Sequence, residues 1–211
     1  MTERDVSGVG AVLPCWSCKG PTSPRALFCS TCGAVQAPGQ VDHFHRLGLP
    51  AGFDLDPAAL DRQYFGLQRR LHPDRFATRS ARERALSQQQ ATAMNEAYET
   101  LKDPLKRAAY LLRLAGRPVD VERAVTVDDP ALLTEALEMR EALADAETVA
   151  EVADLAQRAE GQAALCREAL ARAFAGNDLE RAGKLTTRLK YLDKMIEEAR
   201  ARKTGMTRQG L

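Results

Sequence analysis

The sequence lacks an excess of charge of either sign. Its 211 residues include 30 Lys and Arg against 29 Asp and Glu, a formal net charge of +1. Such a balance gives no reason to expect a nucleic-acid partner. No apolar run approaches the roughly 18 residues of a membrane-spanning helix, so an integral membrane protein is not expected. The first fourteen residues also lack the pattern of a signal or transit peptide, and the cytoplasm is the expected compartment.

The sequence does contain enough apolar residues for a core. Hydrophobic residues make up 45% and charged residues 28% of the chain, as in ordinary globular proteins. The charge is unevenly placed. Residues 61–84 hold seven basic and three acidic side chains, whereas residues 131–160 hold eight acidic and two basic ones. This asymmetry indicates two surfaces for different partners.

Four of the five cysteines form two pairs with a two-residue gap, namely Cys15 with Cys18 and Cys29 with Cys32. In a reducing compartment such pairs favour a metal over disulfides, and four thiolates suit tetrahedral zinc. A redox dithiol is less favoured because a CxxC in that role normally heads a helix in a βαβ setting, which is missing. Iron in the same cage remains an alternative. A site closed by four cysteines predicts a structural zinc and no catalysis.

The chain divides by composition into four segments. Residues 1–40 are rich in Gly, Pro, Ser and Cys and end in a linker at 37–40 that we expect to be flexible. Residues 41–118 are typical of helices interrupted by prolines. Residues 119–200 are rich in Ala, Leu and Glu, and residues 201–211 are predicted to be a disordered tail. We therefore expect an all-α protein: a zinc knuckle, a helical domain and a three-helix bundle.

Apolar residues recur at helical spacing in both helical segments. In the first of them, Leu60, Tyr64, Leu67 and Leu71 share one stripe and Arg62 and Arg69 lie opposite, until Pro73 ends the helix. The C-terminal segment carries three further stripes, which predict a bundle. They are Leu132, Ala136, Met139 and Leu143; Val152, Ala156, Ala159, Ala163, Cys166 and Leu170; and Ala182, Leu185, Leu189, Leu192, Ile196 and Ala199.

The most informative tripeptide is His72-Pro73-Asp74, which directly follows the helix with the basic outer face. The segment 95–104 then predicts a second helix that closes on Leu-x-Asp-Pro. A helix, a tight HPD loop and an antiparallel second helix resemble the J-domain. Residues 42–49 look like the opening helix of that family, with Phe44 and Leu47 as core anchors.

The J-domain resemblance implies a docking surface for an ATP-driven chaperone of the DnaK class, whose ATP hydrolysis the HPD loop triggers. Carried onto this sequence, that surface consists of His72, Pro73 and Asp74 in the loop and of Arg62, Arg69 and Arg70 on the basic face. Arginine suits this role because its guanidinium makes bidentate contacts with carboxylates, and a charged rim speeds encounter.

The C-terminal half resembles the HscB family in the stretches 129–141 and 189–194. Members of that family have a J-domain followed by a three-helix bundle, and they deliver the iron–sulfur cluster scaffold, IscU, to its dedicated chaperone, HscA. The resemblance implies a co-chaperone that is not an enzyme, with an IscU-like scaffold and an HscA-like chaperone as partners. The cysteine pairs are a departure from the short bacterial members, which begin at the J-domain.

Five residues form the expected scaffold-binding surface. Leu133 and Leu137 lie about 100–140° off the apolar stripe of their helix, and Glu138 and Glu141 border them. An exposed apolar pair with an acidic rim is typical of a partner site. Tyr191 also lies off the stripe of its own helix. In the HscB family the matching positions contact the scaffold. The alternative is that both leucines cover another helix.

Three other hypotheses remain open on the sequence alone. The first is a J-domain protein for a different client. The second is a zinc-ribbon nucleic-acid binder with a helical tail, which is disfavoured because Lys19 and Arg25 are the only basic residues of the knuckle. The third is an enzyme that uses His72 and Asp74 as acid and base, but no second cluster of reactive groups converges on them.

Overall fold

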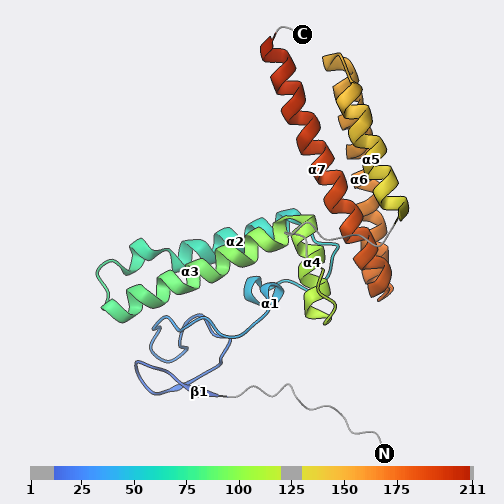
Figure 1. Cartoon of the computed structure of the whole chain (residues 1–211). Helices are drawn as coiled ribbons and strands as arrows, with labels where there is room; N and C mark the ends of the chain where they lie inside the picture. The colour runs from blue at the N-terminus through green and yellow to red at the C-terminus, as the bar shows by residue number, and fades with distance from the viewer. Residues whose placement is uncertain (1–11, 120–129, 210–211) are drawn as a thin grey trace, which may run out of the picture. The chain divides into compact units, whose positions relative to one another are not determined.

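The computed structural model describes residues 12–119 and 130–209, which are mainly helical (Figure 1). The all-α prediction is confirmed, apart from very short strands near the N-terminus. The described residues form two compact units. Unit 1 runs to Ala51 and continues over Leu55–Lys102, and unit 2 consists of Gly52–Asp54 and the described residues from Asp103 onward. No described helix is both long and apolar enough to cross a membrane.

Unit 1 begins with a small module over residues 12–36, here called the knuckle. Strands β1 (Leu13–Pro14) and β2 (Pro21–Thr22) pair in antiparallel fashion. The core of the knuckle consists of Cys15, Cys29 and Ala34, with Trp16 packed against them. So few apolar side chains cannot stabilise a module of this size by burial alone. The knuckle therefore depends on a cross-link or on contacts with its neighbours.

The rest of unit 1 is helical. It contains α1 (His43–Leu47), α2 (Pro57–Leu71), the 3-10 helix η1 (Pro73–Phe76) and α3 (Ala81–Lys102). Helices α2 and α3 lie side by side (Figure 1). They run antiparallel, because the Ser87 hydroxyl donates to the Leu71 carbonyl near the connecting loop, and the Tyr98 hydroxyl donates to Asp61 at the far end.

Side-chain caps fix where these helices begin. The Asp42 carboxylate accepts the His45 backbone N–H at the start of α1, and Asp56 accepts the Ala58 N–H at the start of α2. The predicted core residues Phe44, Leu47, Leu60, Tyr64 and Leu71 are buried, and Leu67 is half-buried. The opening helix and the stripe of α2 are thus confirmed.

Tertiary contacts hold the segment at 37–40, which connects the knuckle to the helices of unit 1. Gly39 passes so close to Pro24 that an added Cβ would lie 2.0 Å from the Pro24 carbonyl oxygen, which is why only glycine fits there. The Gly39 carbonyl in turn accepts from the Arg46 guanidinium at 3.0 Å. The predicted flexible linker at 37–40 is therefore wrong, because tertiary contacts fix this part of the chain.

Unit 2 contains α4 (Pro104–Leu114), α5 (Pro130–Asp145), α6 (Val149–Ala175) and α7 (Leu179–Gln209). Helix α6 begins with a capping box, in which Thr148 and Glu151 each accept the other's backbone N–H. The buried core joins residues of α4, α5, α6 and α7 with Phe53, whose ring stacks on Phe174 at a centroid distance of 5.5 Å. The predicted bundle is present, with α4 added to its core.

The end of α7 differs from the prediction. The helix runs to Gln209, so the predicted disordered tail is wrong for residues 201–209, while 210 and 211 lie outside the described residues. Met206 is buried, and the Arg202 guanidinium donates to the carbonyls of Ala144 and Ala146, at 3.1 and 2.6 Å, where α5 ends. These contacts hold the last turns of α7 in place. Local sequence does not predict them, because the partners are far apart in the chain.

The division between the units also falls earlier than the predicted domain boundary at residue 118. Ala108 and Leu112 of α4 are fully buried in the core of unit 2. Helix α4 therefore packs with the bundle, although composition assigns it to the preceding segment. Residues 1–11 of the predicted first segment, and residues 120–129 of the predicted bundle segment, lie outside the described residues.

Candidate functional site

The HPD loop, residues 72–74, is an exposed turn closed by a side-chain hydrogen bond. The His72 ring nitrogen Nδ1 accepts the Asp74 backbone N–H at 3.3 Å and caps η1, while the Pro73 ring fixes the first φ of that helix. Phe76 is buried and anchors the turn. The side chains of His72 and Asp74 remain 51% and 90% exposed. The loop thus presents an imidazole and a carboxylate to a partner.

The predicted basic face lies on α2. Arg62, Arg69 and Arg70 are all exposed there. Arg62 lies 3.5 Å from Asp56, an exposed ion pair of small energetic weight. Arg70 lies over the ring of Phe28 in the knuckle, 5.2 Å from its centroid. This contact could not be predicted, because no local sequence pattern relates a position in the knuckle to one on α2.

The four-cysteine site is the second feature of unit 1. The Sγ atoms of Cys15, Cys18, Cys29 and Cys32 lie within 4.8 Å of one another and form no disulfide. The Cys15–Cys32 and Cys18–Cys29 sulfur pairs are each 3.8 Å apart. Tetrahedral zinc with bonds of about 2.3 Å places its sulfurs about 3.8 Å apart. The spacing therefore fits one metal ion in a closed cage of four thiolates.

Hydrogen-bond donors point at the sulfurs. The Cys18 backbone N–H, followed by the Ser17 N–H, overcomes burial and lowers the pKa of Cys15 to about 6. The Gly20 N–H pulls the pKa of Cys18 down, but the neighbouring thiols, Cys32 first, outweigh it and raise that pKa to about 11. Thiolates this close cannot all ionise unless a cation lies between them. The cluster therefore suits a cation.

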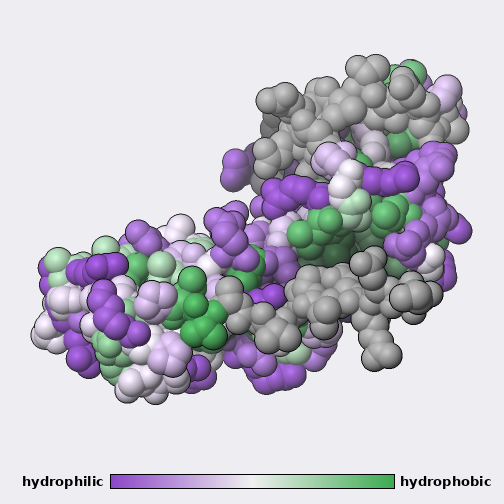
Figure 2. Space-filling model, turned by 90° about the horizontal axis from the view of Figure 1, so that it is seen from below, coloured by the Kyte–Doolittle hydropathy of each residue, from purple (hydrophilic) through white to green (hydrophobic). Residues whose placement is uncertain are grey.

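Leu133 and Leu137 lie on the outer face of α5. They are 45% and 57% exposed, so both lie off the buried stripe of their helix, as the periodicity predicts. Glu138 and Glu141 on the same helix are exposed as well. On the face of the molecule drawn in Figure 2, most of the coloured surface is hydrophilic and the apolar residues gather in limited patches. An exposed leucine pair with acidic neighbours is a candidate partner site.

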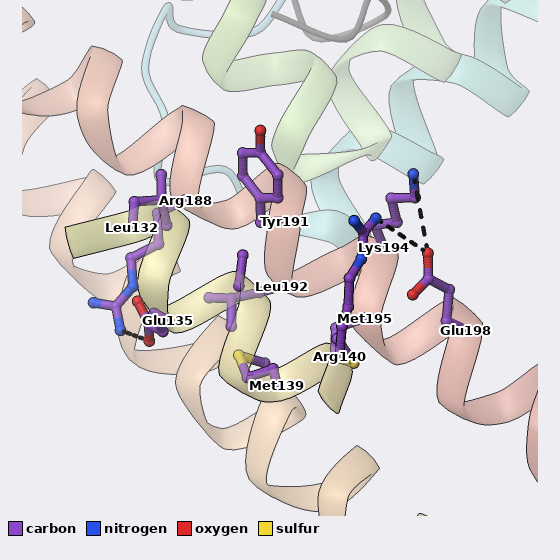
Figure 3. Close-up of a pocket in the computed structure, with 11 residues that line it drawn as sticks. Leu132, Glu135, Met139, Arg140, Arg188, Tyr191, Leu192, Lys194, Met195 and Glu198 are labelled. Atoms are coloured by element: carbon purple, nitrogen blue, oxygen red, sulfur yellow. Dashed lines mark hydrogen bonds and ion pairs between the residues drawn. The ribbon is translucent and has the colours of Figure 1, made fainter. Parts of the chain in front are cut away.

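Tyr191 is one of the residues that line a pocket between α5 and α7 (Figure 3). Leu132, Ala136, Met139, Leu192 and Met195 supply its apolar lining. Glu135 pairs with Arg188 at 2.6 Å, and Glu198 lies 3.6 Å from Arg140 and 3.9 Å from Lys194. Sequence reasoning missed these charged residues, because their pairing depends on how α5 packs on α7. The four predicted surface residues of α5 do not line this pocket.

The helices around the HPD loop have the arrangement of the J-domain of a co-chaperone. A family model described as the DnaJ domain matches residues 42–110, and one described as the HSCB C-terminal oligomerisation domain matches residues 128–200. The chain belongs to the HscB family of iron–sulfur cluster co-chaperones.

Similar proteins support this membership over nearly the whole chain. The human iron–sulfur cluster co-chaperone protein HscB is 34% identical over 93% of this chain and 86% of its own length. A co-chaperone protein HscB homolog from Aeromonas salmonicida is 39% identical over 75% of this chain and 94% of its own length. The crystal structure of human HscB superposes with a TM-score of 0.84, covering 90% of this chain and 98% of that one, at 34% identity.

Proposed function

We propose that this co-chaperone stimulates ATP hydrolysis by a DnaK-class, HscA-like chaperone and delivers an IscU-like iron–sulfur cluster scaffold to it. The chain acts as an adaptor and carries no catalysis of its own. The observation that carries the proposal is the exposed HPD loop, which lies at the end of a helix with a basic outer face. The likeness to proteins named iron–sulfur cluster co-chaperones supports the choice of client.

The chaperone docks on unit 1 through His72, Pro73 and Asp74, with Arg62, Arg69 and Arg70 beside them. Exposed guanidinium groups attract an acidic surface and orient it before contact. The rigid turn then presents His72 and Asp74 without a further loss of backbone entropy. Helix α2 therefore recognises the chaperone, and the loop triggers its ATP hydrolysis.

The scaffold docks on unit 2 through Leu133 and Leu137, with Glu138 and Glu141 as the acidic rim and Tyr191 as a further contact. The two leucines are one helical turn apart and exposed, so a partner can bury both together. Apolar anchors of this kind contribute most of the energy of an interface, while charged rims contribute specificity.

The metal is zinc, held by Cys15, Cys18, Cys29 and Cys32. The donor set and the 3.8 Å sulfur spacing support this choice. Bound zinc supplies a cross-link between the two halves of the knuckle. Because all four positions are protein ligands, the ion has no open position for a substrate, and its role is structural.

A single-turnover ATPase assay tests the proposal. Purified chain is added to a DnaK-class chaperone with and without the scaffold protein. The chain alone is expected to accelerate ATP hydrolysis, and the chain with scaffold to accelerate it further. Absence of acceleration by the wild-type chain contradicts the chaperone assignment. Acceleration without measurable scaffold binding points instead to a J-domain protein for another client.

A further inference from the structure

The metal site is connected to helix α3 by a buried chain of hydrogen bonds. The Gln36 side-chain amide donates to Cys15 Sγ at 3.4 Å. The Gln90 side-chain amide, which comes from α3, donates to the Gln36 backbone carbonyl at 3.0 Å. All three residues are buried, with exposed fractions of 0% for Cys15, 7% for Gln36 and 2% for Gln90. The metal ligand Cys15 is therefore linked to the middle of α3 by two successive hydrogen bonds, through Gln36 and Gln90.

Two aromatic rings of the knuckle lie under arginines of the helices. Trp16 follows Cys15, and its ring lies 4.6 Å from the Arg82 guanidinium of α3. Phe28 precedes Cys29, and its ring lies 5.2 Å from the Arg70 guanidinium of α2. Each ring is thus next in sequence to a metal ligand. Because the ligands fix the backbone on either side of the ion, they also fix where the two rings lie.

We propose that the four-cysteine site braces the chaperone-docking face, and that Gln36, Gln90 and Phe28 are positioning residues for chaperone binding. When the metal is bound, the knuckle holds Phe28 under Arg70 and gives the buried Gln90 amide its acceptor. When the metal is lost, the small core of the knuckle no longer suffices for folding. Arg70 then loses the ring that restricts its rotamers, and ordering it costs the complex more entropy.

This inference rests on the proposed function only where its test measures the stimulation of ATP hydrolysis by the chaperone. The HPD loop has its own cap and anchor, His72 and Phe76, so the brace acts on docking and leaves triggering intact. Loss of the brace is therefore expected to raise the chain concentration needed for half-maximal stimulation. The maximal rate of ATP hydrolysis at saturation is expected to stay unchanged.

The first experiment measures metal release from the full-length zinc-loaded chain into a colorimetric chelator. Gln90→Leu removes the donor to Gln36 and is expected to speed release about 3- to 10-fold. Gln36→Leu removes the donor to the sulfur and is expected to weaken metal binding about 10- to 100-fold. The matched control is Gln89→Leu, an exposed neighbour on the same helix. Release from Gln90→Leu at the rate of this control would overturn the inference.

Trp16 supplies a spectroscopic readout, because it is the one tryptophan of the chain. Its indole N–H donates to the Val35 carbonyl at 2.7 Å. Metal removal is expected to shift its emission to longer wavelength, as the ring leaves Arg82 for water. Arg82→Ala, a change at an exposed residue that spares the core, should shift the emission of the zinc-loaded chain in part. An emission spectrum that is the same with and without metal contradicts the brace.

The second experiment measures ATPase stimulation as a function of chain concentration. Phe28→Leu keeps an apolar side chain but removes the ring, and it is expected to raise the half-saturating concentration about 2- to 5-fold. Phe28→Tyr keeps the ring and should have the half-saturating concentration of wild type. If wild type stimulates and Phe28→Leu is indistinguishable from it, the brace is wrong and the proposed function stands. If wild type itself fails to stimulate, the proposed function is wrong, and metal release from Gln90→Leu still decides whether the metal site is linked to α3.

Discussion

Local backbone geometry places the side chains of His72 and Asp74 at the surface. The Pro73 ring sets the turn, and the hydrogen bond from the Asp74 N–H to His72 Nδ1 closes it. The side chains stay exposed, so a substitution there removes a functional group and leaves the packing of unit 1 in place. Arg62, Arg69 and Arg70 are likewise exposed on α2, although Arg62 pairs with Asp56 and Arg70 lies over the ring of Phe28. At this scale, function and stability are separable.

His72→Gln is expected to reduce ATPase stimulation to the basal rate, because an amide cannot reproduce the imidazole ring that a docking partner meets. The free energy of unfolding should change by no more than about 0.5 kcal/mol, as is typical of surface substitutions. Scaffold affinity should be unchanged. Single-turnover ATPase assays and calorimetry check these outcomes. Full stimulation by this variant would contradict the assigned role of the loop.

Truncation of both Leu133 and Leu137 to Ala is expected to weaken scaffold binding by about 1–4 kcal/mol per residue, if each is an interface anchor. The free energy of unfolding should change little, since both side chains are largely exposed. Leu132→Ala is a matched control, because that buried neighbour should instead destabilise unit 2 by roughly 2–5 kcal/mol. Calorimetric titration with the scaffold and thermal unfolding give the two quantities. Unchanged affinity in the double variant would remove this surface from the site.

At the scale of the element, α7 does more than complete the bundle. Its middle supplies Arg188, Tyr191 and Lys194 to the pocket beside α5. Its last turns bury Met206 and carry Arg202 to the carbonyls at the end of α5. Unpaired carbonyls at the end of a helix need such a donor. The extra length of α7 therefore stabilises the helix that bears the predicted scaffold surface.

Deletion of residues 201–211 is expected to lower the free energy of unfolding of unit 2 by about 2–4 kcal/mol, because it removes one buried methionine and two hydrogen bonds donated by a charged guanidinium. Deletion of residues 208–211 spares both contacts and serves as the control. Denaturant unfolding, followed by circular dichroism, measures the difference. Equal stability of the two truncated chains would show that the last turns of α7 contribute nothing.

At the scale of the whole molecule, the chain is divided into two compact units with separate cores. The metal site lies entirely in unit 1, where the knuckle contacts α2 and α3 through Phe28, Trp16 and Gln36. The candidate scaffold surface lies entirely in unit 2. Metal loss should therefore affect one unit and spare the other.

Cys15→Ser with Cys18→Ser is expected to abolish metal binding and to increase hydrogen exchange at the α3 amides about tenfold or more. The amides of α6 and α7 should exchange as in wild type. The reciprocal control is Leu170→Ala, a change at a fully buried position of α6 that should speed exchange in unit 2 alone. Exchange that rises equally in both units after metal loss would show that the chain unfolds as one body.

The sequence by itself determined the features that depend on local spacing. The stripe of Leu60, Tyr64 and Leu71 identified a helix, because one face must be buried. The HPD tripeptide identified the loop, because proline both stops α2 and sets the turn. The two CxxC pairs identified a metal site, since a gap of two residues brings both sulfurs to one ion. The angular offset of Leu133 and Leu137 likewise predicted their exposure.

Only the tertiary structure decided the features that depend on distant residues. The four residues at 37–40 have the composition of a flexible linker, yet close approach to Pro24 and a hydrogen bond from Arg46 fix Gly39. The last turns of α7 look like a polar tail until Arg202 and Met206 find partners. Gln36 and Gln90 are 54 residues apart. A hydrogen bond between them has no signature in either segment, because it forms only when the knuckle and α3 are packed together.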